Sequence, residues 1–246
     1  MRIDKLLANL GYGSRKDVKQ LLKKGLVKAD GAKLSSASSH VDPEAQEITV
    51  SGETVDYKPY IYLMMHKPQQ VISATVDDVH DTVIDILEIE DAVRDPFPVG
   101  RLDKDTEGLL LITNDGKFAH ALTSPKKGVK KTYEAVLDQD VSEEDTALFK
   151  SGVTLDAGYV TKPAELYVKD GIDKKEVIVV ISEGKFHQVK RMFEAVGKKV
   201  LYLKRTHIGT LALDPDLAPG EYREMSSDEV EDLLEEAYQK KSNGSL

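Results

Sequence analysis

The chain has 246 residues, of which 40% are hydrophobic and 31% charged, and this composition predicts a globular protein with one large domain or two unequal ones. Cysteine is absent, which excludes disulfides, thiolate catalysis and cysteine-ligated metal sites. Because no apolar run reaches about 18 residues and the first residues lack the apolar core of a signal peptide, we expect a cytoplasmic protein without a membrane span.

The first 58 residues predict two short helices and a small sheet. Apolar residues recur at helical spacing over 2–10, and Ser14 with Asp17 three residues later is typical of a capped start to a second helix. The pair Asp30-Gly31 is typical of a hairpin turn. Short strands are expected at 26–29 and 48–50, and a linker at 57–59. A segment of this size is near the lower limit for an independent core.

Charge is distributed unevenly along the chain. The net charge of −9 argues against a generic nucleic-acid binder, but residues 1–33 carry nine Lys and Arg against three Asp, a local net charge of +6. A second basic stretch runs through 185–205, whereas acidic residues gather in 77–95 and 221–236. Segregated charge can hold RNA, although solvated surfaces carry such runs as well. The basic side chains of the second predicted helix, which form one surface with the turn that follows, are Arg15, Lys16, Lys19 and Lys23.

The rest of the chain interleaves strands and helices without regular βαβ spacing. We therefore expect an α+β domain over 59–230 with a mixed, mainly antiparallel sheet, and an acidic helix with a frayed tail over 231–246. Strands are predicted at 60–65, 71–75, 109–113, 133–137, 176–181 and 200–204. Helices are predicted at 82–87, from 118 onward, at 187–196 and at 228–239.

The densest group of polar side chains is a glycine-bounded loop at 100–108, where Asp103, Asp105 and Glu107 occupy alternate positions. An EF-hand calcium loop is excluded because its last ligand position holds Asn114 and prolines interrupt the entering helix. An aspartyl-phosphate phosphatase is disfavoured because the preceding residues make a poor strand. A glycosidase-like carboxylate pair and a solvated acidic turn without chemistry both remain open.

The first 58 residues resemble the S4-type RNA-binding domain. The matching segments are residues 2–7, 14–16 and 25–31. The resemblance implies binding of structured RNA, mostly through phosphates and shape, and it implies nothing about chemistry.

The remaining chain resembles the pseudouridine synthases of the RsuA/RluA superfamily, and within it the RsuA branch. The loop at 100–108 with the strand after it is similar to the second motif of these enzymes. The first motif precedes it at 63–68, with His66 where Asn is commoner. The later motifs follow in order at 131–133, 183–193, 203–209 and 219–223. The resemblance implies isomerisation of a uridine within RNA, with no metal and no cofactor.

The resemblance also implies roles for individual residues. Asp103 would be the essential carboxylate, which attacks C1′ or removes the proton at C2′. Either role requires an ionised carboxylate, which a nearby cation stabilises. Lys190 is expected to be this cation, with Arg191 as the alternative. Tyr133 would stack on the flipped base and assist transfer of the C5 proton.

Other residues would bind or shape the site. Arg101 would fill the place that the uracil vacates and contact phosphate, and Leu203 would close the pocket. His187 is expected to be structural, and the residues from Asp105 to Glu107 to shape the loop. Candidates for phosphate contacts are Lys126, Lys127, Lys130, Lys131, Lys198, Lys199, Lys204 and Arg205.

Three functions are compatible with these features. The first is a pseudouridine synthase that acts on one uridine of ribosomal RNA, with 16S RNA favoured over 23S RNA by the opening residues and the short acidic end. The second is a non-catalytic RNA-binding factor in ribosome assembly. The third is a metal-dependent hydrolase that uses the acidic loop. We expect a monomer with ribosomal RNA as its partner.

Overall fold

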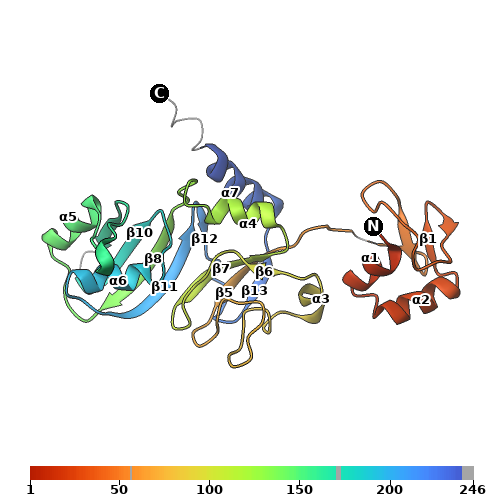
Figure 1. Cartoon of the computed structure of the whole chain (residues 1–246), viewed down its shortest axis with the longest axis horizontal. Coiled ribbons are helices and arrows are strands. Elements are labelled where there is room, and N and C mark those ends of the chain that lie inside the picture. The colour runs from red at the N-terminus through yellow and green to blue at the C-terminus, as the bar shows by residue number, and fades with distance from the viewer. Residues whose placement is uncertain (56, 170–172, 240–246) are drawn as a thin grey trace. The chain divides into compact units, whose positions relative to one another are not determined.

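The computed structural model describes residues 1–55, 57–169 and 173–239, and the chain divides into two compact units (Figure 1). The first unit comprises Met1–Ile61 with Leu87–Pro96, and the second comprises Tyr62–Ile86 with Phe97–Leu246. The tail at 240–246, which was predicted to fray, lies outside the described residues. Among the described helices, none combines the length and the apolar composition that a bilayer crossing requires.

The first unit packs two helices against a small antiparallel sheet. The helices are α1 (Ile3–Asn9) and α2 (Arg15–Lys23). The strands β1 (Val27–Ala29), β2 (Ala32–Lys33), β3 (Ile48–Val50) and β4 (Glu53–Thr54) pair in the order β2–β1–β3–β4. Ile3, Leu7 and Val18 from the helices are fully buried against the sheet. The unit therefore has a core of its own. The short helix α3 (Ile89–Ala92) lies in the second segment of this unit.

Two local predictions for this unit are confirmed. The Ser14 side chain accepts the amide of Asp17, and the Asp17 carboxylate accepts the amide of Ser14, which completes the capping box of α2. Asp30 and Gly31 have φ angles of 49° and 76° and connect β1 to β2. Positive φ at both central residues is what a two-residue type I′ hairpin turn requires.

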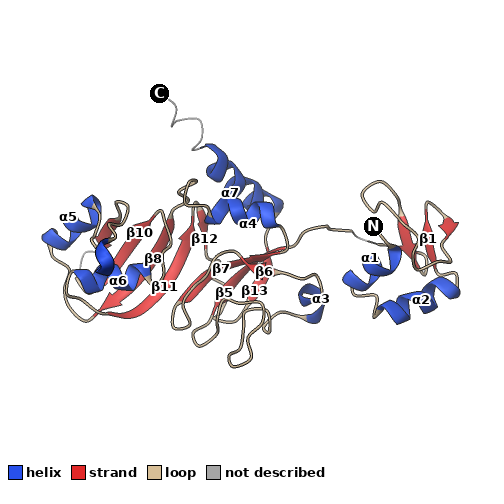
Figure 2. Ribbon diagram, in the orientation of Figure 1, coloured by secondary structure: helices blue, strands red, loops and turns tan. Residues whose placement is uncertain are grey.

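The second unit is built on a mixed sheet, as the sequence predicted (Figure 2). Its strand order is β13–β5–β7–β11–β8–β10–β9, with β6 paired to β7 and β12 to β11. All pairs are antiparallel except β7 with β11. The strands are β5 (Tyr62–Lys67), β6 (Phe97–Pro98), β7 (Glu107–Thr113), β8 (Lys131–Leu137), β9 (Glu165–Val168), β10 (Glu176–Ile181), β11 (Val200–Ile208), β12 (Leu211–Ala212) and β13 (Tyr222–Glu224).

Helices cover this sheet at two places. Helix α4 (Gly116–Thr123) and helix α7 (Ser227–Gln239) lie side by side and share a core with β5 and β7, in which Phe118 and Leu233 are almost fully buried. Helix α5 (Glu143–Ser151) packs near β9, and helix α6 (Gln188–Ala195) packs near β11. A 3₁₀ turn covers Asp156–Gly158.

The parallel pair β7–β11 depends on one glycine. Gly108 lies opposite Arg205 and has a φ of 108°. A Cβ atom at this position would lie 2.2 Å from the carbonyl oxygen of Arg205, so only glycine allows the strands to approach. This approach places the loop that precedes β7 directly beside β11.

Two predicted elements are wrong. The segment 71–75 is not a strand, because only Ile72 makes a β-bridge, with Thr82. The segment 82–87 is a turn rather than a helix. The Asp85 carboxylate accepts both the amide and the hydroxyl of Thr82 at 2.8 Å, as in a capping box, but no helix follows. Instead the amide of Val83 donates to the carbonyl of Ile72, which joins this segment to the neighbouring loop. Both segments belong to loops whose backbone groups bond to other loops.

A buried ion pair stabilises the outer part of the second unit. The Lys198 ammonium lies 2.6 Å from the Asp145 carboxylate, with 11% and 8% of the side chains exposed. Burial opposes ionisation of Asp145, but hydrogen bonds from Lys198 and Ser142 outweigh it and hold the pKa of this carboxyl below its usual value. The candidate role of Lys198 in phosphate contact is therefore wrong, because its ammonium is engaged inside the protein.

We expect Lys198→Met to lower the free energy of unfolding by about 3–5 kcal/mol at pH 7, because it leaves a buried carboxylate without its cation. A depressed carboxyl pKa contributes stability above the unfolded value, and this contribution is lost as the pH falls through the folded value. The variant should therefore lose less stability than the wild type below about pH 4. Urea unfolding across pH measures both effects. Lys199→Met, at the exposed neighbour, is the control, and equal midpoints for the two variants would contradict the prediction.

Candidate active site

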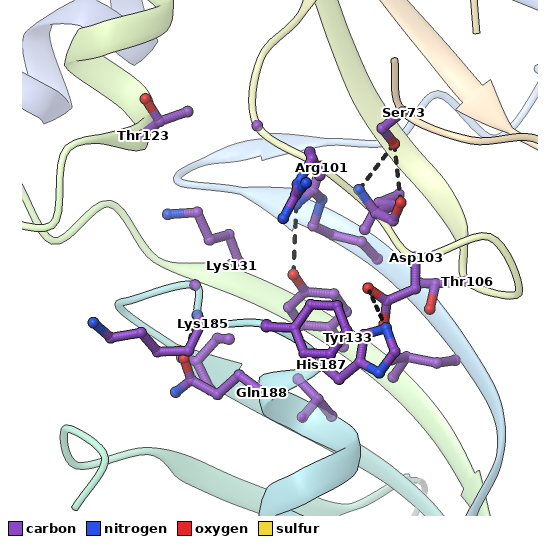
Figure 3. A pocket seen from close by; sticks show the side chains of 18 of the residues that line it. Ser73, Arg101, Asp103, Thr106, Thr123, Lys131, Tyr133, Lys185, His187 and Gln188 are labelled. Atoms are coloured by element: carbon purple, nitrogen blue, oxygen red, sulfur yellow. Dashed lines mark hydrogen bonds and ion pairs between the residues drawn. The ribbon is translucent and has the colours of Figure 1, made fainter. Parts of the chain in front are cut away.

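A pocket with a volume of about 540 Å³ opens in the second unit (Figure 3). Its walls come from loop segments at 72–74 and 99–106, from β8 and β11, and from the segment that leads into α6. The residues predicted to carry the chemistry or hold the base that line it together are Arg101, Asp103, Tyr133, Lys190 and Leu203. Two of the predicted phosphate contacts, Lys131 and Arg205, line it as well, and so does His187. The fold thus brings together side chains that lie up to about 100 positions apart in the chain.

The loop that carries Asp103 is held by Ser73 on one side. The Ser73 hydroxyl lies 3.0 Å from both the amide nitrogen and the carbonyl oxygen of Leu102, whose side chain is buried. The amide of Thr106 donates to the carbonyl of Asp103 at 3.1 Å and closes a tight turn. With Leu102 pointing inward, Arg101 is left exposed at the pocket.

On the other side the same loop is held by Lys67, at the end of β5. Its side chain is fully buried, and its ammonium donates to the carbonyls of Pro68, Asp103 and Thr106 at 2.9, 3.1 and 2.9 Å. Burial lowers the pKa of Lys67 to about 8, against the opposing effect of the nearby carboxylates. Lys67 therefore fixes the backbone of the loop and does not reach into the pocket with its charge.

The Asp103 carboxylate lies between two nitrogen groups. The Lys190 ammonium is 3.4 Å from Oδ2, and His187 Nε2 is 3.5 Å from Oδ1, so that Asp103 and His187 face each other in Figure 3. About a quarter of the Asp103 side chain is exposed. A carboxylate in this position is open to the pocket and lies next to a cation.

Lys190 is shared between two carboxylates. Its ammonium lies 2.5 Å from Asp105 Oδ1, closer than to Asp103. Burial opposes ionisation of Asp105, but Lys190 holds the pKa of this carboxyl below its usual value. The loop therefore presents two carboxylates to one lysine, and only the carboxylate of Asp103 belongs to a pocket-lining residue.

The segment before α6 sets the direction of Lys190. Gln188 accepts the amide of Lys185 at 2.8 Å and donates to Glu183 at 2.9 Å, and both Gln188 and Glu183 are buried. His187 has a φ of 48° and precedes the helix. Its ring stacks on Phe186 with centroids 3.8 Å apart. His187 was predicted to be structural, and its position beside Asp103 is a contact that the sequence did not indicate.

Arg191 points elsewhere. Its guanidinium pairs with Asp156 at 2.5 Å and bonds to the carbonyl of Phe186, and Arg191 is not among the residues that line the pocket. Consecutive helical residues point about 100° apart, so only one of Lys190 and Arg191 can face Asp103. In this structure that residue is Lys190.

The floor of the pocket is formed by β8 and β11. Tyr133 lies opposite Arg205 in the antiparallel pair, and the two side chains contact each other, with the guanidinium carbon 5.9 Å from the ring centroid. Tyr133 and Leu203 are 8% and 4% exposed. An aromatic ring and an aliphatic side chain that are buried at the base of a pocket provide flat, apolar surface for a ring-shaped ligand.

Arg205 is the second candidate phosphate contact that the structure contradicts. It is 3% exposed, and its Nε donates to the carbonyl of Leu109 at 2.8 Å, so it cannot reach a phosphate at the surface. The sequence contains an indirect sign that this side chain is buried. Residues two apart in a strand share a face, and Arg205 lies two positions after Leu203, which was expected to close the pocket. Lys67 ends the apolar strand β5, and nothing in the sequence indicated that its side chain is buried.

The basic side chains predicted to bind RNA lie on the first unit. Those on α2 are all exposed: Arg15, Lys16, Lys19 and Lys23. The buried stripe of the same helix contains Val18 and Leu22, so the basic residues occupy the remaining surface. Such a surface can contact several phosphates at once.

Comparison with known proteins identifies the family of the chain. Residues 61–195 match the family model of the RNA pseudouridylate synthases, and residues 1–47 match that of the S4 domain. The chain therefore belongs to the RNA pseudouridine synthase family and is an isomerase with an N-terminal S4 domain.

The relatives extend over nearly the whole chain. An uncharacterized RNA pseudouridine synthase of Bacillus subtilis, YtzG, is 55% identical over 96% of this chain and 99% of its own length. The ribosomal small subunit pseudouridine synthase A of Vibrio cholerae is 41% identical over 94% and 98%, and that of Escherichia coli is 38% identical over 95% and 100%. A crystal structure of a pseudouridylate synthase superposes with a TM-score of 0.67 at 36% identity, covering 95% of this chain and 99% of that one.

Proposed function

We propose that this protein converts one uridine of the small-subunit (16S) ribosomal RNA to pseudouridine. The observation that carries the proposal is the Asp103 carboxylate, which is open to the pocket and has a lysine ammonium 3.4 Å away. The choice of small-subunit RNA is supported by the relatives named ribosomal small subunit pseudouridine synthase A, which are similar to nearly the full chain.

The reaction needs an ionised carboxylate and a place to hold a detached base. Asp103 either bonds to C1′ or removes the proton at C2′, and the C1′–N1 bond breaks. The uracil then turns and C5 bonds to C1′, while the Asp103–C1′ bond breaks or, in the second case, the proton returns to C2′. The proton on C5 is released and N1 takes up a proton. Lys190 places its positive charge beside the Asp103 carboxylate, and Tyr133 stacks on the base. Extruding a base costs about a few kcal/mol, which contacts within the pocket must offset.

Residues at the pocket mouth and on the first unit would hold the RNA backbone. Arg101 is exposed at the pocket, where it can contact phosphate and fill the place of the extruded base. The basic surface of α2 adds contacts that do not depend on the base. We propose that the protein acts as a monomer on ribosomal RNA in the cytoplasm.

Replacing Arg15, Lys16, Lys19 and Lys23 together by alanine should weaken RNA binding by about 10–100-fold at moderate salt and reduce its salt dependence, because up to four phosphate contacts are lost. The single-turnover rate at saturating RNA should stay within about threefold of the wild type, because none of these residues lines the pocket. Filter binding across salt concentrations and single-turnover kinetics separate the two quantities. A fall in the saturating rate with unchanged affinity would oppose this division of labour.

The proposal is tested by tritium release from small-subunit RNA labelled at uridine C5, with EDTA present. Release of stoichiometric tritium, followed by mapping of a single site, would support it. Release only from large-subunit RNA would keep the reaction and replace the substrate. Binding without release from any ribosomal RNA would favour the assembly-factor alternative, and release that EDTA abolishes would favour a metal-dependent reaction.

A further inference from the structure

Arg205 carries a buried hydrogen-bond donor that the fold leaves unused. Its Nε donates to the carbonyl of Leu109 at 2.8 Å, and Nη1 lies 3.5 Å from the Tyr133 hydroxyl. In the part of the chain that the structure describes, Nη2 is buried and has no hydrogen-bond partner. Buried donors without a partner are rare, because each one loses its hydration without compensation.

The charge of Arg205 is also uncompensated. No carboxylate pairs with its guanidinium among the described residues, and its two hydrogen-bond acceptors are neutral. Gly108 allows β7 to lie against the backbone of Arg205, so the residue is enclosed from that side. A buried cation without an anion is costly to the folded protein. The cost is offset if a bound ligand places negative charge next to the guanidinium.

The position of Arg205 restricts what that ligand can be. Arg205 lines the pocket next to Tyr133, on the buried floor. A phosphodiester stays with the RNA backbone at the mouth, near the exposed Arg101, whereas the extruded base reaches the floor. The uracil ring offers two carbonyl oxygens, O2 and O4, as acceptors.

We propose that the guanidinium of Arg205, which belongs to a pocket-lining residue and keeps a spare donor, donates a hydrogen bond to a carbonyl oxygen of the target uracil and that its charge stabilises the detached base; this rests on the proposed function. When the C1′–N1 bond breaks, its electron pair leaves with N1 and spreads onto O2 and O4. Arg205 transfers no proton. It supplies a fixed positive charge where negative charge develops, so its contact is stronger at bond cleavage than in the bound substrate. Arg205 is then a catalytic residue that contacts the base.

The test combines substitution of the protein with substitution of single atoms in the RNA. Substrates carry uridine, 2-thiouridine or 4-thiouridine at the target position, since sulfur is a weak acceptor. Single-turnover rates are measured at saturating enzyme by chromatography of the digested product. For the wild type, one of the two thio-substitutions should slow the reaction by about 10–100-fold. Arg205→Lys should slow the uridine reaction by about 10²-fold, and the same thio-substitution should then cost less than about threefold.

Several outcomes overturn the proposal. An equal thio penalty in the wild type and in Arg205→Lys means that another group contacts the oxygen. If neither thio-substitution slows the wild-type reaction, the proposal is wrong. This outcome needs no variant, so it tests the proposal even if Arg205→Lys fails to fold. Arg205→Gln, which can still donate to the Leu109 carbonyl without a charge, gives a second comparison, and a wild-type rate there excludes a role for the charge. A wild type that is inactive on uridine RNA instead refutes the proposed function itself.

Discussion

Asp103→Asn is expected to lower the single-turnover rate of tritium release by at least about 10⁴-fold, while RNA affinity stays within about threefold of the wild type. The amide has nearly the same shape as the carboxylate, but it can neither bond to C1′ as an anion nor accept the proton from C2′. The contacts that hold the loop, from Ser73 and Lys67 to backbone groups, do not involve the Asp103 side chain. The loss therefore reports on chemistry and not on loop position.

Asp105→Asn is the matched control for this experiment. It removes a carboxylate from the same loop, two residues further on, and Asp105 is not among the residues lining the pocket. Its rate should stay within about tenfold of the wild type, since Lys190 keeps its contact with Asp103. If Asp105→Asn proves as inactive as Asp103→Asn, or if Asp103→Asn retains activity, the assignment of the essential carboxylate is wrong.

Lys190→Met is expected to lower the saturating rate by about 10²-fold, with a smaller effect on RNA binding. The ammonium lies 3.4 Å from the Asp103 carboxylate. Without it, Asp103 and Asp105 form a pair of nearby carboxylates with no lysine between them. Single-turnover kinetics at saturating enzyme and filter binding measure the two effects. Lys190→Arg should recover part of the rate because it keeps the charge.

Arg191→Met is the control that distinguishes the two neighbouring cations. Its guanidinium pairs with Asp156 and Arg191 does not line the pocket, so the rate should be close to that of the wild type. If Lys190→Met leaves the rate unchanged and Arg191→Met lowers it, the assignment of the two cations is reversed.

Elements with strong local signals could be predicted from the sequence. The capping box at Ser14 and the hairpin at Asp30-Gly31 are local contacts between residues a few positions apart, and both are present. The sheet of the second unit was predicted as mixed and mainly antiparallel, and this is confirmed. Helix α5 was missed although Ser142 and Asp145 form a second capping box, and the segments at 71–75 and 82–87 were misread because their hydrogen bonds go to loops.

Motif order along the chain identified the family, and it placed Asp103, Tyr133, Lys190, Arg101 and Leu203 as candidates that all line one pocket. Spacing within the acidic loop was not enough to separate a catalytic carboxylate from a solvated one, since both readings use the same residues. The motifs around the loop favoured the catalytic interpretation, because five ordered motif matches are more specific than one.

Tertiary structure alone decided which charged side chains face the pocket. Lys190 and Arg191 are neighbours in the chain, and only the packing of α6 turns the first toward Asp103 and the second toward Asp156. Arg205 was expected to contact phosphate and Lys67 was assigned no role, yet both are buried, because Gly108 lets β7 lie directly against β11 and the loop closes over Lys67. Hydrophobic pattern and turn chemistry act over a few residues, so the sequence determines them locally. The burial of a charge depends on strands far apart in the chain, and it is settled only when they pack.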